Sequence, residues 1–473
     1  MGIGLSQAEP HAIFVPRVRY HIQMRELLQS VALRAARYLE DIQERRVGPS
    51  AEAVRELARF DEPFPEGPSA PQDVIRMLDE VGSPATMGTA GRRFFGFVIG
   101  GSLPAALGAN WLASAWDQNA GLFAATPVSA TLEEVSLRWL LDALALPAVC
   151  GGAFVTGATV ANFTALAAAR RAVLGRAGWD VEAQGLFGAP EIQVVVSREA
   201  HPSVIKSLGM LGMGRERVVT VPVDGQGRML AGMLPELKPP VIVCVQAGNV
   251  NTGSFDPVEE ICRRARECGA WVHVDGAFGL WAAASPRYAH LGAGVGGADS
   301  WATDAHKWLN VPYDSGLALV RDAGHLRGAM SLAAAYLPQG GHREPSQYVP
   351  ELSRRARGVD TWAALKSLGR GGLAELIDRN CHCATQFAEG LAGAGFEILN
   401  DVVLNQVLVS FGTPEATWRV IAGLQEDGTC WCGPTLWQER VAMRISVSSW
   451  ATTEADVDRS LDAVLRIARD DSG

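Results

Sequence analysis

Two long stretches of the chain contain no Asp, Glu, Lys or Arg: Phe94 to Trp116 and Ala143 to Ala169. Each has the length of a bilayer-spanning helix, which takes about 20 residues. Four glycines and Pro104 interrupt the first stretch, however, and three glycines and Pro147 interrupt the second. Membrane-spanning helices rarely carry so many breakers. We therefore expect buried strands, turns and helices, and no membrane partner.

The composition supports a large packed protein. Of 473 residues, 48% are hydrophobic and 20% are charged, which argues against intrinsic disorder. The net charge of −9 argues against nucleic acid as a partner, because nucleic-acid binding needs a basic stripe. The eight cysteines form no Cys-x-x-Cys unit with zinc-ligand spacing, and no signal peptide opens the chain. We expect reduced cysteines, no metal site and a cytoplasmic protein.

Hydrophobic patterning divides the chain into three parts. Residues 1–85 predict a helical N-terminal arm that is broken by the Pro-rich segment Glu62 to Pro68. Residues 86–370 alternate short apolar runs, such as Val241 to Val245, with helical runs, such as Val258 to Cys268. This alternation predicts an α/β domain with a largely parallel sheet flanked by helices. Residues 371–473 predict a small α+β domain.

Binding sites in parallel sheets lie at the carboxyl ends of the strands, so the residues that follow each apolar run are informative. Phe154-Val155 leads into Thr156-Gly157-Ala158-Thr159 and an Ala-rich helix. The free amides of such a helix N-terminus can hold a phosphate, with Gly157, Ala158 and Thr159 as candidates. A simple N-cap at Thr156 or Thr159 explains the same pattern. Neither a dinucleotide fingerprint nor a P-loop is present.

Two charged residues follow other apolar runs. Asp275 ends the run Trp271 to Val274, and Lys307 lies among apolar and aromatic residues in Ala298 to Leu309. Each has an alternative reading, since the aspartate can cap a helix and the lysine can extend its ammonium to solvent. Together with an anion cradle they match pyridoxal phosphate, which needs a lysine, a carboxylate at its ring nitrogen and a phosphate site.

Four segments resemble the group II pyridoxal-phosphate-dependent amino acid decarboxylases, which include aromatic amino acid, glutamate and diaminobutyrate decarboxylases. They are Thr156 to Asn162, Ser197 to Ser203, His273 to Ala277 and Ala298 to Leu309. The resemblance extends from Phe94 to Val447. It implies a fold-type I enzyme that converts an L-amino acid into the amine and carbon dioxide.

The resemblance also implies roles for individual residues. Lys307 is then the lysine that forms the cofactor aldimine, and Asp275 is the partner of the pyridinium nitrogen. His201 is expected to stack on the cofactor ring and to orient or protonate the substrate, although a satisfied core histidine is an alternative. Ala277 is expected under the ring, and His306 at the phosphate.

Three further residues are expected at the substrate. Arg444 corresponds to an arginine that meets substrate carboxylate in some members, although a structural salt bridge would explain it as well. Phe97, in an aromatic segment with Phe94 and Phe95, favours an aromatic substrate, although buried core is an equal alternative. Tyr348, in the polar segment Gln339 to Tyr348, is the candidate proton donor.

The chain departs from the family in two places. Asp304 precedes His306 and Lys307 where many decarboxylases carry asparagine, and we expect it to point away from the phosphate because a carboxylate would repel it. Gln246 to Gly253 replaces a Thr-rich turn of the family. A carbon-carbon lyase, an aminotransferase or an oxidative aldehyde-forming decarboxylase therefore stays open, as do an unrelated nucleotide-binding protein and a silent binding module. The fold also implies a homodimer with shared active sites.

Overall fold

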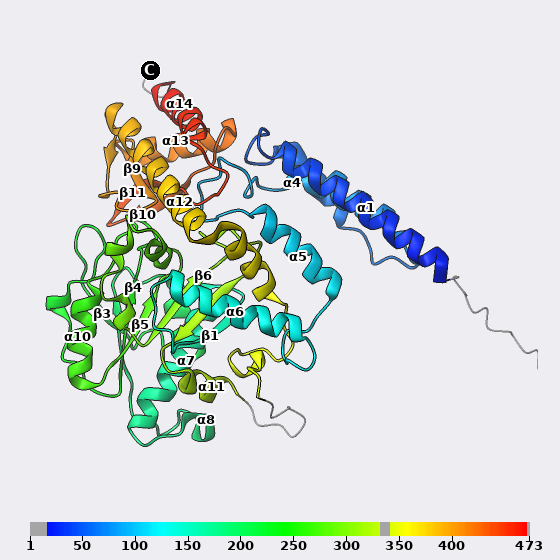
Figure 1. The fold of residues 1–473 in the computed structure, drawn as a ribbon. Helices are drawn as coiled ribbons and strands as arrows, with labels where there is room; N and C mark the ends of the chain where they lie inside the picture. Colours follow the sequence, from blue (N-terminus) through cyan, green and yellow to red (C-terminus); the bar gives the residue numbers. More distant parts are fainter. Residues whose placement is uncertain (1–16, 332–340, 471–473) are drawn as a thin grey trace, which may run out of the picture. The chain divides into compact units, whose positions relative to one another are not determined.

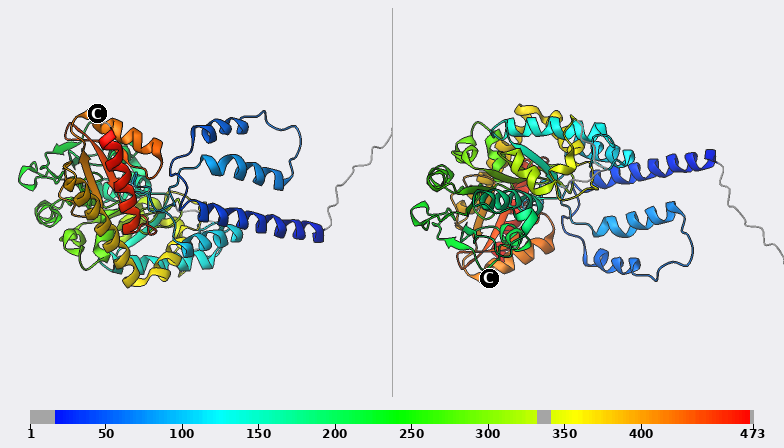
Figure 2. Two further views of the ribbon diagram at one scale, coloured as in Figure 1. Left: turned by 90° about the horizontal axis from the view of Figure 1, so that it is seen from above. Right: turned by 90° about the horizontal axis from the view of Figure 1, so that it is seen from below.

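The computed structural model describes residues 17–331 and 341–470, in two compact units, Met1–Gly88 and Thr89–Gly473. The described residues of the first unit, 17–88, contain helices, which are shown in blue in Figure 2. Pro-rich residues 62–68 lie in a non-helical connection, because proline lacks the amide that a helix interior needs. An ion pair between Arg34 Nη1 and Asp79 Oδ2, at 2.5 Å, joins the long first helix to the segment Leu78–Gly82. The helices of this unit are α1 (Arg17–Asp41), α2 (Ala51–Glu56), α3 (Pro71–Met77) and α4 (Ser83–Ala85).

The second unit is built around a seven-stranded sheet of order β1-β7-β6-β5-β4-β2-β3. Six strands run parallel to one another, and β7 is antiparallel to both of its neighbours. The predicted largely parallel sheet is therefore confirmed, with β7 as the exception that the sequence patterning did not reveal. The strands are β1 (Gly151–Val155), β2 (Gln193–Ser197), β3 (Val219–Val221), β4 (Val241–Gln246), β5 (Trp271–Asp275), β6 (Ser300–Asp304) and β7 (Gly316–Val320).

Helices cover both faces of this sheet (Figure 1). Because side chains alternate along a strand, Ile242 and Cys244 of β4 pack on the face of α7, α9 and α11, whereas Val243 and Val245 pack on the opposite face, against α6, α10 and α12. Apart from the edge strand β3, the strands are buried on both faces, which explains their continuous apolar runs. The helices are α5 (Pro104–Trp116), α6 (Pro127–Ala143), α7 (Ala158–Arg176), α8 (Val181–Gln184), α9 (Pro202–Met210), α10 (Val258–Cys268), α11 (Ala323–Met330) and α12 (Arg357–Gly393).

The C-terminal residues form a second, four-stranded antiparallel sheet of order β10-β11-β9-β8. Its strands are β8 (Glu397–Ile398), β9 (Gln406–Ser410), β10 (Gly433–Trp437) and β11 (Arg440–Ser446), and its helices are α13 (Pro414–Asp427) and α14 (Glu454–Asp470). Helix α12 leads into this region and is kinked at Gly369, where φ is 60° and ψ is −173°. The boundary that the sequence predicts at residue 371 lies beside this kink, and the three-part division stays a prediction.

The two uncharged stretches are parts of this packing. Phe94 to Trp116 contains α5, and Ala143 to Ala169 contains β1 and most of α7. Within the described ranges 17–331 and 341–470, none of the helices has both the length and the apolar character that crossing a bilayer requires.

Candidate active site

Three adjacent strands of the large sheet end in polar side chains on the same face. Gln246, Asp275 and Asp304 are the last residues of β4, β5 and β6, and Gln246 pairs with Asp275 in register. Side chains alternate between the two faces of a strand, and these three side chains lie on the face where Ile242, Cys244 and Ala302 pack toward α7. All three are at most 5% exposed. The carboxyl ends of these strands therefore form a buried polar edge below the N-terminus of α7.

Asp275 is held by two donors. Its Oδ2 accepts a hydrogen bond from Asn162 Nδ2 of α7 at 3.3 Å, and its Oδ1 accepts one from the backbone amide of Ala277 at 3.2 Å. A buried carboxylate needs such donors, because an unpaired buried charge is costly. This geometry leaves a fixed negative charge at the strand end, which is what a protonated pyridine nitrogen requires.

Lys307 lies in the turn that follows β6, and its ammonium contacts Asp304. Lys307 Nζ is 3.1 Å from Asp304 Oδ2, and His306 Nε2 is 3.5 Å from Asp304 Oδ1. Among the described residues, Oδ1 has no hydrogen-bond partner. His306 Nδ1 accepts the backbone amide of Ser315 at 3.0 Å, and burial lowers the pKa of the His306 imidazole.

The expectation that Asp304 points away from the phosphate turn is wrong. A methyl group on Gly157 would lie 3.4 Å from Asp304 Oδ1 and 3.0 Å from His306 Cε1, so the carboxylate borders this turn. The physical reason is the ion pair with Lys307, because the ammonium offsets a charge that is only 2% exposed.

The turn after β1 has the features of an anion cradle. Helix α7 begins at Ala158, with Gly157 as its N-cap and without a side-chain cap hydrogen bond. The alternative that Thr156 or Thr159 caps this helix is therefore not realised, and the first amides of α7 are available to an anion. Gly316 of β7 packs so closely on this turn that a methyl group added to Gly316 would lie 2.4 Å from Gly157 Cα. The turn thus fits the phosphate of pyridoxal phosphate, with Ala277 and Lys307 at the adjoining strand ends.

His201 lies at the start of α9, after β2. Its Nδ1 accepts the backbone amide of Ser203 at 3.2 Å and lies 2.8 Å from the Ser203 hydroxyl. Burial lowers the pKa of His201, and the charge of Asp275 opposes this shift. The charges of Lys307, Arg444 and Asp304 also act on His201. By geometry, His201 is linked to Asp275 through Ser203 and Asn162, which are joined to each other and to these residues by hydrogen bonds.

Arg444 comes from β11 of the second sheet. Its Nη1 lies 3.3 Å from the carbonyl oxygen of Val250 and 3.4 Å from Asn251 Oδ1. In the described part of the chain, Arg444 forms no salt bridge with a carboxylate, so the structural salt bridge that the sequence left open is not observed there. Burial lowers the pKa of its guanidinium. A largely buried cation with neutral partners can accept a carboxylate ligand.

Tyr348 and Phe97 contact other aromatic and cationic side chains. The Arg343 guanidinium lies 4.3 Å from the centre of the Tyr348 ring, which packs against the core beside α7. Of the predicted segment Gln339 to Tyr348, Gln339 and Gly340 fall outside the described residues. Phe97 is 62% exposed and its ring centre is 5.2 Å from that of Trp431.

The neighbouring aromatics Phe94 and Phe95 are buried. Phe94 stacks on Trp431 at 5.0 Å, and Phe95 packs edge-on against Phe387 in the core of the second sheet. For these two residues the structure shows buried packing, which the sequence had left as an equal alternative. Only Phe97 of the three presents an exposed ring.

Sequence reasoning missed the residues that support the site. Asn162, Ser203, His273 and Ser300 form a buried hydrogen-bonded network beneath Asp275 and His201. The sequence could have indicated this network, because a histidine and a serine at buried positions of apolar strands, His273 and Ser300, need hydrogen-bond partners.

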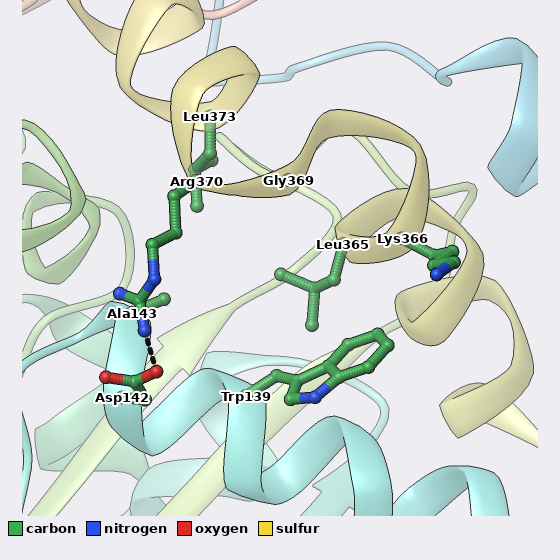
Figure 3. Close-up of a pocket in the computed structure, with 8 residues that line it drawn as sticks. All are labelled: Trp139, Asp142, Ala143, Leu365, Lys366, Gly369, Arg370 and Leu373. Atoms are coloured by element: carbon green, nitrogen blue, oxygen red, sulfur yellow. Dashed lines mark hydrogen bonds and ion pairs between the residues drawn. The ribbon is translucent and has the colours of Figure 1, made fainter.

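A separate cavity of about 360 Å³ lies between α6 and α12, at the Gly369 kink. Figure 3 shows Trp139 and Leu365 facing its interior, with Arg370 paired to Asp142 at its rim. It shares no residue with the group around His201, so it is not part of the candidate active site. The full set of lining residues is Trp139, Asp142, Ala143, Leu365, Lys366, Gly369, Arg370 and Leu373.

Comparison with known proteins gives one consistent family. Residues 55–412 match the family model described as "Pyridoxal-dependent decarboxylase conserved domain". The chain is 26% identical over 420 residues to an aromatic-L-amino-acid decarboxylase of Bacillus atrophaeus, covering 84% of this chain and 85% of the relative. It is 30% identical over 387 residues to an L-2,4-diaminobutyrate decarboxylase of Rhizobium meliloti (strain 1021), covering 77% and 75%. An acidic amino acid decarboxylase GADL1 of Bos taurus is 29% identical over 394 residues, covering 79% and 73%.

Solved structures share the fold. The Oryza sativa TDC structure with PLP and tryptamine superposes with a TM-score of 0.87 at 21% identity, covering 99% of this chain and 100% of that chain. The mouse CSAD structure also gives a TM-score of 0.87 at 21% identity, covering 95% and 99%. The predicted fold-type I architecture is thereby confirmed.

Proposed function

Because the chain belongs to the pyridoxal-dependent decarboxylase family and is an amino acid decarboxylase that uses pyridoxal phosphate, we propose that its substrate is an L-amino acid with an aromatic side chain. The products would be the amine and carbon dioxide. The observation that carries this proposal is that Asp275 and Lys307 follow the ends of the adjacent strands β5 and β6, beside the turn that starts α7. Hydrogen bonds through Asn162 and Ser203 link Asp275 to His201, and Asp304, the ion-pair partner of Lys307, borders that turn.

When bound, pyridoxal phosphate supplies an electron sink for the pair left by the departing carboxylate. Lys307 would hold the cofactor, and Asp275 would hold a proton at its ring nitrogen. The amides of Gly157, Ala158 and Thr159 would bind the phosphate, together with His306. Ala277, whose amide is bonded to Asp275, would lie under the ring.

Arg444 would bind the α-carboxylate of the substrate. Its neutral hydrogen-bond partners, Val250 and Asn251, leave its charge available to an anion. His201 would orient the same substrate group. Tyr348, whose ring packs against Arg343, is proposed as the proton donor, through a rearrangement of its segment or a site shared within a homodimer.

The preference for an aromatic side chain is supported by the exposed ring of Phe97 beside Trp431. Gly100, three residues later, packs on the carbonyl oxygen of Lys307, so this segment runs from the aromatic pair to the lysine. Arg444 favours a second candidate, an acidic side chain, because it would equally accept a side-chain carboxylate.

The test is a screen of the twenty amino acids for carbon dioxide release by the holoenzyme, with amine and hydrogen peroxide measured in parallel. Release from aromatic amino acids, with amine and without peroxide, is expected. Release from aspartate or glutamate alone would replace the aromatic assignment with the acidic one. Stoichiometric peroxide with aldehyde would identify oxidative decarboxylation, and transfer of the amino group without carbon dioxide would identify an aminotransferase.

A further inference from the structure

A continuous chain of buried hydrogen bonds links Trp271, at the start of β5, to His201. Asn162 lies at its centre: its Oδ1 is 2.9 Å from His273 Nε2, and its Nδ2 is 3.3 Å from Asp275 Oδ2. Nδ2 is also 3.2 Å from Ser203 Oγ. Asn162 and His273 are both fully buried. The network therefore has no access to solvent at its centre.

The charge of Asp275 sets the direction of the bonds on one side of Asn162. A carboxylate only accepts hydrogen bonds, so Asn162 must turn its NH₂ group toward Asp275 and its carbonyl toward His273. His273 must then donate a hydrogen bond from Nε2, because the Asn162 carbonyl oxygen can only accept one. Its Nδ1, at 2.9 Å from Ser300 Oγ, must accept.

The outer end of the chain agrees with this direction. Trp271 Nε1 can only donate, and it lies 2.9 Å from Ser300 Oγ. Ser300 therefore accepts from Trp271 and donates its own hydrogen to His273 Nδ1. Burial lowers the pKa of His273 to about 4, so this imidazole is neutral near neutral pH. The series of hydrogen bonds is therefore intact at that pH.

The other side of Asn162 leads to His201. The second hydrogen of the Asn162 NH₂ group goes to Ser203 Oγ, which leaves the hydroxyl hydrogen of Ser203 for His201 Nδ1 at 2.8 Å. The backbone amide of Ser203 also donates to Nδ1, at 3.2 Å. Two donors therefore occupy Nδ1, and this nitrogen cannot carry a hydrogen. In the described residues, Nε2 of His201 has no hydrogen-bond partner.

From this directionality we infer that the Asn162 network fixes His201 as a neutral imidazole with its hydrogen on Nε2, so that His201 donates a hydrogen bond to the substrate carboxylate and does not accept a proton. Asn162 and Ser203 are then positioning residues for His201. The identity of the acceptor rests on the proposed decarboxylation. The tautomer rests only on the network.

The tautomer can be measured directly in the intact holoenzyme. The full-length chain is labelled with ¹⁵N-histidine, loaded with pyridoxal phosphate, and studied at pH 7 by long-range ¹H–¹⁵N correlation, with His201 assigned by the loss of its signals in His201→Asn. The expected pattern is one protonated nitrogen, Nε2, and one unprotonated nitrogen, Nδ1. A hydrogen on Nδ1, or an imidazolium at pH 7, would overturn the inference.

Variants test whether the network sets this state. Ser203→Ala removes the hydroxyl donor and is expected to shift the His201 Nδ1 resonance toward that of an unbonded nitrogen, and Asn162→Leu is expected to shift it in the same direction. Ser207→Ala is the matched control, because Ser207 is a buried serine of the same helix whose hydroxyl, among the residues that the structure describes, contacts only the backbone carbonyls of Thr159 and Ser203. Equal spectra in all three variants would contradict the role of the network.

The spectra also separate the two proposals. If no amino acid releases carbon dioxide while His201 shows the Nε2–H form, the substrate assignment fails and the tautomer stands. If carbon dioxide is released while His201 carries its hydrogen on Nδ1, only the inference about the network fails.

Discussion

The most direct structural prediction concerns Gly100, in the first uncharged stretch. A methyl group at this position would lie 1.7 Å from the carbonyl oxygen of Lys307 and 2.8 Å from its carbonyl carbon. Ordinary van der Waals contact begins at 3.4 Å, so the two backbones would have to separate by about 1.7 Å. Neither atom belongs to a flexible side chain that could rotate away. Gly100→Ala must therefore displace the peptide that carries the cofactor lysine.

A misplacement of about 1 Å near a reacting group can cost on the order of 100-fold in rate. We expect Gly100→Ala to lose about that factor or more in kcat/KM, together with a weaker visible absorbance of the lysine-bound cofactor. The matched control is Gly108→Ala, in the same stretch, where a methyl group meets no atom within 4 Å. Because Gly108 lies inside α5, its replacement should stabilise the helix by up to about 1 kcal/mol.

The assay is a comparison of decarboxylation rate and cofactor absorbance between the two variants and the unchanged chain. If Gly100→Ala keeps both the rate and the absorbance, then the close approach of this segment to Lys307 is not what positions the lysine. A loss in both variants would instead indicate a general sensitivity of the stretch to added volume.

Three other predictions follow from buried ionisable groups. Glu133 is 1% exposed and pairs with the fully buried Arg354, so Glu133→Gln should destabilise the protein by about 3–5 kcal/mol, seen as a lower urea midpoint; an unchanged midpoint would refute it. Burial lowers the pKa of His273 from 6.5 to about 4 in the folded protein. The resulting contribution to the free energy of unfolding, about 3 kcal/mol, is present above pH 6.5 and is lost as the pH falls toward 4. His273→Gln should flatten that part of the curve of unfolding midpoint against pH. Asp304→Asn removes a charge beside the phosphate turn and should tighten pyridoxal phosphate binding about tenfold in an absorbance titration, whereas weaker binding would show that the ion pair with Lys307 matters more.

Local patterning was sufficient for much of the fold. The apolar runs that became β4 and β5 and the helix Val258–Cys268 were recognisable because each buries a continuous apolar face. Strand β7 was not predicted, since its antiparallel direction depends on its pairing with β1 and β6 and not on its own sequence. The kink at Gly369 also depends on packing across α12, because glycine allows many backbone conformations and specifies none.

The candidate site divides in the same way. Asp275 and Lys307 could be identified from sequence alone, because a charge at the end of an apolar strand is costly to bury and therefore marks a partner or a ligand. The direction of the Asp304 side chain could not, since it depends on an ion pair with Lys307 whose geometry the spacing does not define. The network at Asn162 was also not predictable, because Asn162 bonds to His273 and Asp275, which lie 111 and 113 positions further along the sequence.

The sequence by itself therefore determined the sheet class, the family and the charged residues at the strand ends, because each depends on local hydrophobicity, spacing and the cost of burying charge. Only the tertiary structure decided that Gly100 presses on the Lys307 backbone, that Asp304 borders the phosphate turn, and which nitrogen of His201 is free to donate. These features arise from contacts between distant segments. The physical reason is that hydrogen-bond direction and steric exclusion depend on distances between atoms, which only folding brings within a few ångströms of one another.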